Sequence, residues 1–135
     1  MRGLEMKFYY TGIRVRNLDD SIAFYTEMMG MKLLNRSKIM TTKGEVASLK
    51  SPKSDQILEL NFYDRGSPYA SPYTVGEGLD HLAFKVDDVR KTVEEMRGRG
   101  VSIALEPFVE TNEEGGTGTL AYIRDPNGMW IELFQ

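Results

Sequence analysis

The chain repeats itself at a spacing of about 70 residues, and this repeat limits the folds that are open to it. Four apolar positions of the first half recur 71 residues later: Val15 as Val86, Leu18 as Val89, Ile22 as Val93 and Tyr25 as Met96. Near the end of each half stands a matching tetrapeptide, Ile-Leu-Glu-Leu at 57–60 and Trp-Ile-Glu-Leu at 130–133. An internal duplication explains both matches and predicts two modules of the same fold.

Each half contains the same order of predicted elements, βαβββ. In the first half, alternation of apolar and polar residues from about 9 to 15 predicts a strand, and Asn17 and Gly30 mark the ends of an amphipathic helix. Further strands are expected at 32–37, 46–51 and 57–63. In the second half the corresponding elements are a strand at 81–86, a helix that begins after Asp88, and strands at about 102–108, 119–124 and 129–134.

One Gly-, Pro- and Ser-rich stretch separates the halves. A length of 135 residues is typical of one domain. We therefore expect a single domain over 1–135, with module 1 at about 7–63, a linker at about 64–79 and module 2 at about 80–135.

Composition excludes several classes of function. The net charge is −3, and no segment gathers Lys and Arg into a stripe, so neither nucleic acid nor a membrane surface is expected as a partner. The chain lacks a long apolar run and an apolar secretory core at its start, which favours a cytoplasmic location. With no cysteine and one histidine, disulfides, thiolate zinc sites and cysteine nucleophiles are excluded. A metal site that takes two histidines from one chain is excluded as well.

The duplication also pairs polar residues that could carry chemistry. Tyr10 corresponds to His81 at an offset of 71, and Glu59 corresponds to Glu132 at an offset of 73. Each of these side chains is expected on the strand face opposite the apolar, helix-facing residues. If the two sheets curl towards each other, the four side chains converge. One imidazole, two carboxylates and one phenol suit a divalent cation with mixed nitrogen and oxygen ligands.

Four segments carry a resemblance to a known family: TGIRVRNLDDSIAFYTEMMGMKLL, ILELNFY, GLDHLAFKVDDV and YIRDPNGMWIELFQ. Together they resemble the glyoxalase and vicinal oxygen chelate superfamily over nearly the whole chain. The first helix is most similar to that of glyoxalase I (lactoylglutathione lyase). The resemblance implies an α+β fold in which two βαβββ modules form a partly open mixed β-barrel around a metal.

The resemblance also implies the residues of the site. Glu59, His81 and Glu132 would be metal ligands, and Tyr10 occupies the position where glyoxalase I has histidine or glutamine. The set admits one divalent metal per site, Zn, Ni, Co, Mn or Fe(II), and no organic cofactor is expected. Arg14 matches an arginine that pairs with a glutathione carboxylate. The other candidate substrate-binding residues are Asn61, Lys85, Trp130 and Tyr63, which replaces an asparagine of glyoxalase I.

The implied reaction is proton abstraction beside a carbonyl of a hemithioacetal-type small molecule, with an enediolate stabilised by the metal. Glu132 is the expected base, and its duplicate Glu59 could share the role. The family further implies a homodimer, in which each site takes ligands from both chains.

Two other functions stay open on the sequence. One is another metal enzyme of the same superfamily, a dioxygenase or an epimerase. The other is a metal-free protein that binds small molecules in an aromatic groove of Tyr10, Tyr63, Trp130 and Phe134.

Overall fold

The computed structural model describes residues 9–70, 72–76, 79, 81–111 and 115–135. The chain divides into two compact units, Met1–Tyr73 and Thr74–Gln135, and their boundary falls inside the predicted linker. The expected start of module 1, near residue 7, lies outside the described residues. Within the described residues, no helix is both long enough and apolar enough to span a membrane.

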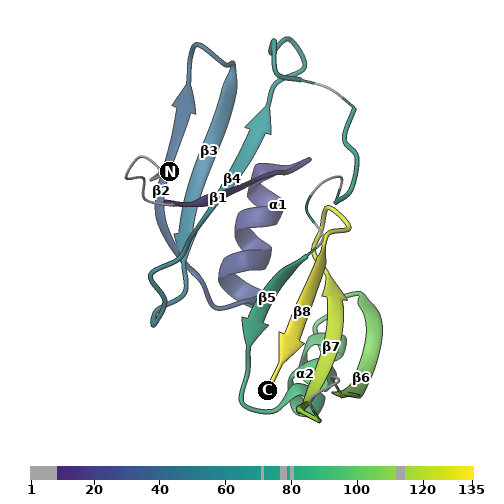
Figure 1. Cartoon of the computed structure of the whole chain (residues 1–135). Coiled ribbons are helices and arrows are strands. Elements are labelled where there is room, and N and C mark those ends of the chain that lie inside the picture. The colour runs from purple at the N-terminus through teal and green to yellow at the C-terminus, as the bar shows by residue number, and fades with distance from the viewer. Residues whose placement is uncertain (1–8, 71, 77–78, 80, 112–114) are drawn as a thin grey trace, which may run out of the picture. The chain divides into compact units, whose positions relative to one another are not determined.

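The first unit contains a mixed four-stranded sheet in the order β1-β4-β3-β2 (Figure 1). Its strands are β1 (Thr11–Arg14), β2 (Lys32–Ile39), β3 (Gly44–Lys50) and β4 (Ile57–Tyr63). β1 runs parallel to β4, whereas β2 and β3 form an antiparallel ladder with it. β1 is shorter than the predicted 9–15, since its register with β4 runs from Thr11 to Arg14.

The helix of the first unit begins as the sequence predicts and then widens. The Asn17 side chain accepts a hydrogen bond from the Asp20 amide at 2.9 Å, and this bond caps α1 (Leu18–Ala23). The helix continues as a π-helix, η1 (Phe24–Met28), whereas the sequence pattern predicts one ordinary amphipathic helix up to Gly30. Phe24 and Tyr25 are both buried, so the wide turn directs two consecutive rings into the core. Gly30, at φ 70°, ends the helix as expected.

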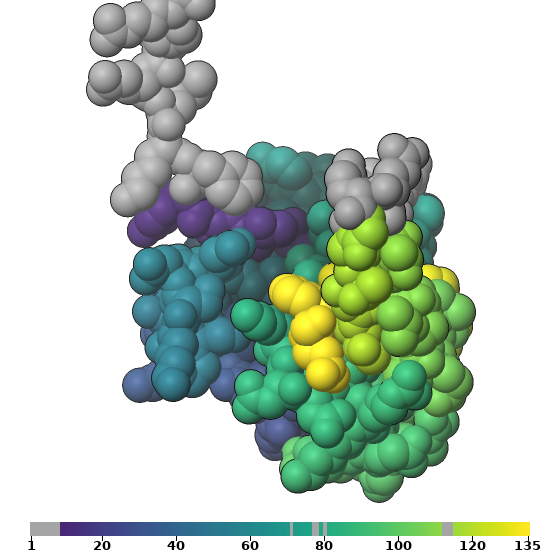
Figure 2. Space-filling model, turned by 60° about the horizontal axis from the view of Figure 1, so that its bottom comes forward, coloured from purple at the N-terminus to yellow at the C-terminus, as the bar shows by residue number. Residues whose placement is uncertain are grey.

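The second unit repeats this plan with the sheet order β5-β8-β7-β6. Its elements are β5 (Leu82–Lys85), α2 (Val89–Gly98), β6 (Ile103–Thr111), β7 (Thr117–Arg124) and β8 (Trp130–Phe134). Asp88 caps α2 by accepting a hydrogen bond from the Lys91 amide at 3.0 Å. β5 and β8 are parallel, and β8 also pairs with β7, beside which it reaches the surface (Figure 2). The expected α+β fold of two βαβββ modules is thereby confirmed.

Strand register confirms the duplication residue by residue. Gly12 lies opposite Glu59 in the β1–β4 pair, and Ala83 lies opposite Glu132 in the β5–β8 pair. The neighbours of each glutamate along its strand are buried: Leu58, Leu60, Ile131 and Leu133. Because side chains alternate along a strand, each glutamate lies on the face opposite the core.

The turn between β7 and β8 is fixed by a buried carboxylate. Asp125 Oδ1 accepts hydrogen bonds from the Asn127 and Met129 amides, each at 2.8 Å, and Oδ2 accepts one from Asn127 Nδ2 at 3.1 Å. Asp125 and Asn127 are 5% and 1% exposed. This turn therefore sets the position at which β8 begins.

Candidate functional site

The second unit brings two of the predicted ligands together. His81 directly precedes β5, and Glu132 lies at the centre of β8, which neighbours β5 in the sheet. His81 Nε2 is 3.6 Å from Glu132 Oε1, and the two side chains are 31% and 18% exposed. The pair therefore presents one nitrogen and one oxygen donor on the face of the sheet opposite the core.

A third residue of this cluster, Tyr122, was not found from the sequence. Its hydroxyl donates a hydrogen bond to Glu132 Oε1 at 2.9 Å. Its ring contacts His81 edge-on, with centroids 5.5 Å apart and planes at 89°, and it packs at 5.4 Å against Trp130. The sequence Asp-Pro-Asn-Gly at 125–128 holds the missing signal, because it is typical of a turn, and counting back along the hairpin from it places Tyr122 opposite Glu132.

The first unit presents its own polar face around Glu59. A Cβ added to Gly12 would lie 3.2 Å from Asn61 Nδ2, 3.7 Å from Tyr10 Cε2 and 3.9 Å from Glu59 Oε1. Glycine at this position thus leaves open the space that these three side chains surround. Tyr10 is 45% exposed and makes an edge contact with the ring of Tyr9.

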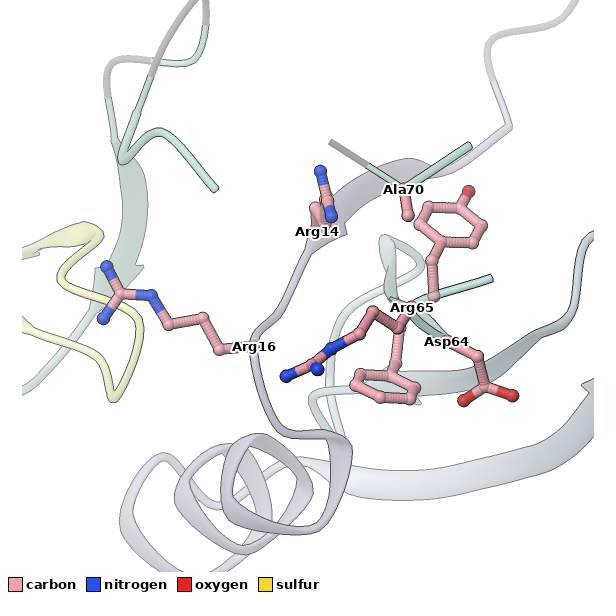
Figure 3. A pocket seen from close by; sticks show the side chains of 7 residues that line it. Arg14, Arg16, Asp64, Arg65 and Ala70 are labelled. Carbon is pink, nitrogen blue, oxygen red and sulfur yellow. The ribbon is translucent and has the colours of Figure 1, made fainter. Parts of the chain in front are cut away.

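A cavity of about 550 Å³ lies at the ends of β1 and β4 in the same unit (Figure 3). Its lining combines positive charge with aromatic surface: Arg14, Arg16, Phe62, Tyr63, Asp64, Arg65 and Ala70. Arg14 and Tyr63 were predicted to bind substrate, and the guanidinium of Arg14 lies 5.8 Å from the centre of the Tyr63 ring. Arg65 was not predicted as a site residue, because it lies in the stretch interpreted as a linker.

The charged side chains of the cavity point in different directions. In Figure 3, the Arg65 side chain points towards the segment that carries Arg14 and Arg16, whereas the Asp64 carboxylate points away from it. Arg16 extends to the other side, and its guanidinium lies 4.6 Å from the centre of the Tyr73 ring. Positive charge therefore dominates the hollow next to Arg14 and Arg65, which suits a carboxylate or another anionic group.

The donor set is compatible with a divalent metal. Two ligands about 2.1 Å from a tetrahedral ion stand roughly 3.4 Å apart, close to the 3.6 Å between His81 and Glu132. The hydrogen bond from Tyr122 to Glu132 is the kind of support that ligating carboxylates have. Within the ranges that the structure describes, no three His, Asp or Glu side chains are gathered at one point. Glu59 belongs to the first unit and the other two predicted ligands to the second.

Two predicted substrate-binding residues lie in the second unit. Lys85 is exposed at the end of β5, on the same side of the strand as Ala83. Trp130 is 37% exposed, and it packs between Tyr122 and the Arg124 guanidinium, which lies 5.9 Å from the centre of its ring.

Comparisons with known proteins identify the family. The sequence pattern of the Glyoxalase/Bleomycin resistance protein/Dioxygenase superfamily matches residues 7–133. The chain is 35% identical to lactoylglutathione lyase GLX1 of Arabidopsis thaliana over 96% of its own length and 44% of that protein. It is 34% identical to a probable lactoylglutathione lyase of Vibrio cholerae, over 96% of its own length and 90% of that protein. The chain thus spans less than half the length of the plant relative.

Solved structures agree with the sequence relatives. Glyoxalase I of Leishmania major, a trypanothione-dependent enzyme, superposes with a TM-score of 0.72 at 33% identity, over 97% of this chain and 87% of that one. Glyoxalase I of Zea mays gives a TM-score of 0.73 at 33% identity, over 93% of this chain and 43% of that one. The duplicated βαβββ modules, the glutamates in matching register and these relatives lead to one conclusion. The chain belongs to the Glyoxalase/Bleomycin resistance protein/Dioxygenase superfamily.

Proposed function

We propose that the protein is a metal-dependent lyase of the glyoxalase I type, which isomerises the hemithioacetal of a thiol and a 2-oxoaldehyde to a 2-hydroxy thioester. The observation that carries the proposal is the His81–Glu132 pair, 3.6 Å apart on the exposed face of the second sheet. The relatives named lactoylglutathione lyase, from a plant and a bacterium, support the same type of enzyme.

His81, Glu132 and Glu59 would hold the cation, and Tyr10 is a further candidate ligand. A bound divalent cation would draw electron density from two neighbouring substrate oxygens and so acidify the adjacent carbon. Glu132 takes the proton from the carbon that bears sulfur and returns it to the neighbouring carbon. The hydroxyl proton passes to the other oxygen, so that no atom is gained or lost in the isomerisation. Glu59, at the duplicated position, could share this task.

The cavity of the first unit supplies a place for the thiol portion of the substrate. Arg14 and Arg65 offer guanidinium groups for an anionic end, and Phe62 and Tyr63 offer apolar surface beside them. Arg14 is two residues beyond Gly12, the partner of Glu59, so its main-chain position lies about 7 Å further along β1 and on the same face of the strand as Gly12. A thiol with a carboxylate at its end, such as glutathione, has a charge that suits this lining.

Turnover of the hemithioacetal of glutathione and methylglyoxal tests the proposal. We expect wild-type protein to contain stoichiometric divalent metal after purification without chelator, and to form the thioester. Glu132→Gln should lower kcat at least 100-fold, since an amide cannot accept the proton. Glu95→Gln, an exposed change on α2, is the matched control and should leave kcat unchanged. Wild-type activity in the Glu132→Gln variant would contradict the role of Glu132.

A metal-free binding protein is the second candidate function, and the aromatic lining of the cavity favours it. Protein that binds small anions in the cavity but neither metal nor hemithioacetal would support this alternative. The expected homodimer and cytoplasmic location stay predictions from the sequence. Light scattering at micromolar concentration would show two chains per particle if the dimer forms.

A further inference from the structure

The two duplicated glutamates have different neighbours across the sheet. Glu132 on β8 lies opposite Tyr122 on β7, and Glu59 on β4 lies opposite Ser48 on β3. Strand order matches in the two modules, and so does the register of the three strands around each glutamate, so Ser48 and Tyr122 occupy equivalent places. A duplication alone would give both carboxylates the same surroundings. The exchange of serine for tyrosine removes this equivalence.

Tyr122 restrains the Glu132 carboxylate directly. Its hydroxyl donates to Oε1 at 2.9 Å, which is the same oxygen that lies 3.6 Å from His81 Nε2. The ring is itself held in place, edge-on against His81 at 5.5 Å and packed against Trp130 at 5.4 Å. A rotation of Glu132 away from His81 would break the hydrogen bond. The tyrosine thus fixes both the donor oxygen and its distance from the imidazole.

Glu59 has no comparable restraint. No side chain within the described part of the protein donates a hydrogen bond to its carboxylate, and Asn61, two residues along, directs its amide to the main-chain oxygens of Ile13 and Glu59 at 3.4 and 3.5 Å. Gly12 opposite leaves open space beside Oε1. Glu59 therefore has room to change rotamer.

We propose that Tyr122 is a positioning residue: its hydroxyl orients Glu132 beside His81 for cation binding, and Ser48 at the equivalent position gives Glu59 no such partner. The proposal rests on the proposed function for the presence of a cation. It goes beyond that function because it assigns a part in cation binding to Tyr122, a residue outside the predicted ligand set. Tyr122 acts through Glu132 and does not itself touch the reacting atoms.

The experiment compares Tyr122→Phe with a matched control, Tyr69→Phe. The first change keeps the ring against His81 and Trp130 and removes only the hydroxyl. The second removes a hydroxyl from an exposed tyrosine of the other unit and keeps its stacked contact with Tyr63. Zn²⁺ affinity is measured for metal-free protein by competition with a chromophoric chelator. We expect Tyr122→Phe to weaken Zn²⁺ binding by roughly 10- to 100-fold, the usual effect of losing a partner that orients a ligand. Tyr69→Phe should bind like wild type.

The outcomes separate this inference from the proposed function. With metal in excess, Tyr122→Phe should keep the wild-type KM, because the hydroxyl does not contact substrate. Zn²⁺ affinity within about twofold of wild type in Tyr122→Phe would overturn the inference, even in a fully active enzyme. Weakened Zn²⁺ binding in a protein that does not isomerise hemithioacetals would support the inference while the proposed function failed. Failure of wild-type protein to bind Zn²⁺ would overturn both.

Discussion

Replacing Asp125 by alanine should strongly destabilise the protein. Its Oδ1 accepts two main-chain hydrogen bonds at 2.8 Å, from Asn127 and Met129, in a place where Asp125 is only 5% exposed. Hydrogen bonds to a charged group contribute about 1.5–3 kcal/mol each, and alanine would leave two buried N–H donors without an acceptor. We expect a loss of about 3 kcal/mol in the free energy of unfolding, a large part of a total of about 5–15 kcal/mol.

Urea denaturation followed by tryptophan fluorescence measures this loss of free energy of unfolding. Trp130 is the only tryptophan, and it is the first residue of β8, directly after the turn. With a slope of about 1–3 kcal/mol per molar urea, the transition midpoint should fall by roughly 1–3 M. Asp125→Asn keeps an acceptor at Oδ1 but turns an amide NH₂ towards Asn127 Nδ2, so its effect should be intermediate. Asp55→Ala, at an exposed loop position, is the control. A loss below about 1 kcal/mol in Asp125→Ala would refute the role assigned to this turn.

Three further predictions concern the caps, the core and the cavity. Asn17→Ala and Asp88→Ala remove equivalent helix caps, so each should cost about 1 kcal/mol in thermal or urea unfolding, whereas a loss in only one would contradict their equivalence. Leu60→Ala creates a cavity at a fully buried position of β4 and should lower the free energy of unfolding by about 2–5 kcal/mol, measured by urea titration. A smaller loss would mean that the neighbouring side chains relax to fill the cavity. Arg65→Gln should raise KM for the hemithioacetal severalfold at unchanged kcat in steady-state assays, and an unchanged KM would exclude Arg65 from substrate binding.

Much of the fold could be predicted because the duplication shows the sequence pattern of each helix and strand twice. The caps Asn17 and Asp88 and the stop at Gly30 depend on local chemistry that sequence shows directly. The π-helix at Phe24–Met28 could not be predicted in this way. An amphipathic pattern with the period of an α-helix is also compatible with a single π-helical turn. The packing of the Phe24 and Tyr25 rings in the core decides between an α-helix and a π-helix at this position.

The candidate site was predictable only where strand alternation determines it. Alternation and the offsets of 71 and 73 identified Glu59, His81 and Glu132, since these depend on which face of a strand a residue occupies. Tyr122 was not predicted, because its contact with Glu132 depends on the register between β7 and β8 and not on the pattern within its own strand. Arg65 was not predicted, because it follows β4 in a stretch without periodicity, where composition predicts only the absence of regular structure.

The strands around Glu59 and Glu132 have the same register, so each glutamate can be compared with the other, position by position, within one chain. Positions 48 and 122 lie opposite the two glutamates in the same register, so a side chain exchanged between them keeps a glutamate as its cross-strand neighbour. Ser48→Tyr would bring to Glu59 the type of neighbour that Glu132 already has. Substitutions of this kind, made one at a time, would show which differences between the two modules distinguish the two glutamates.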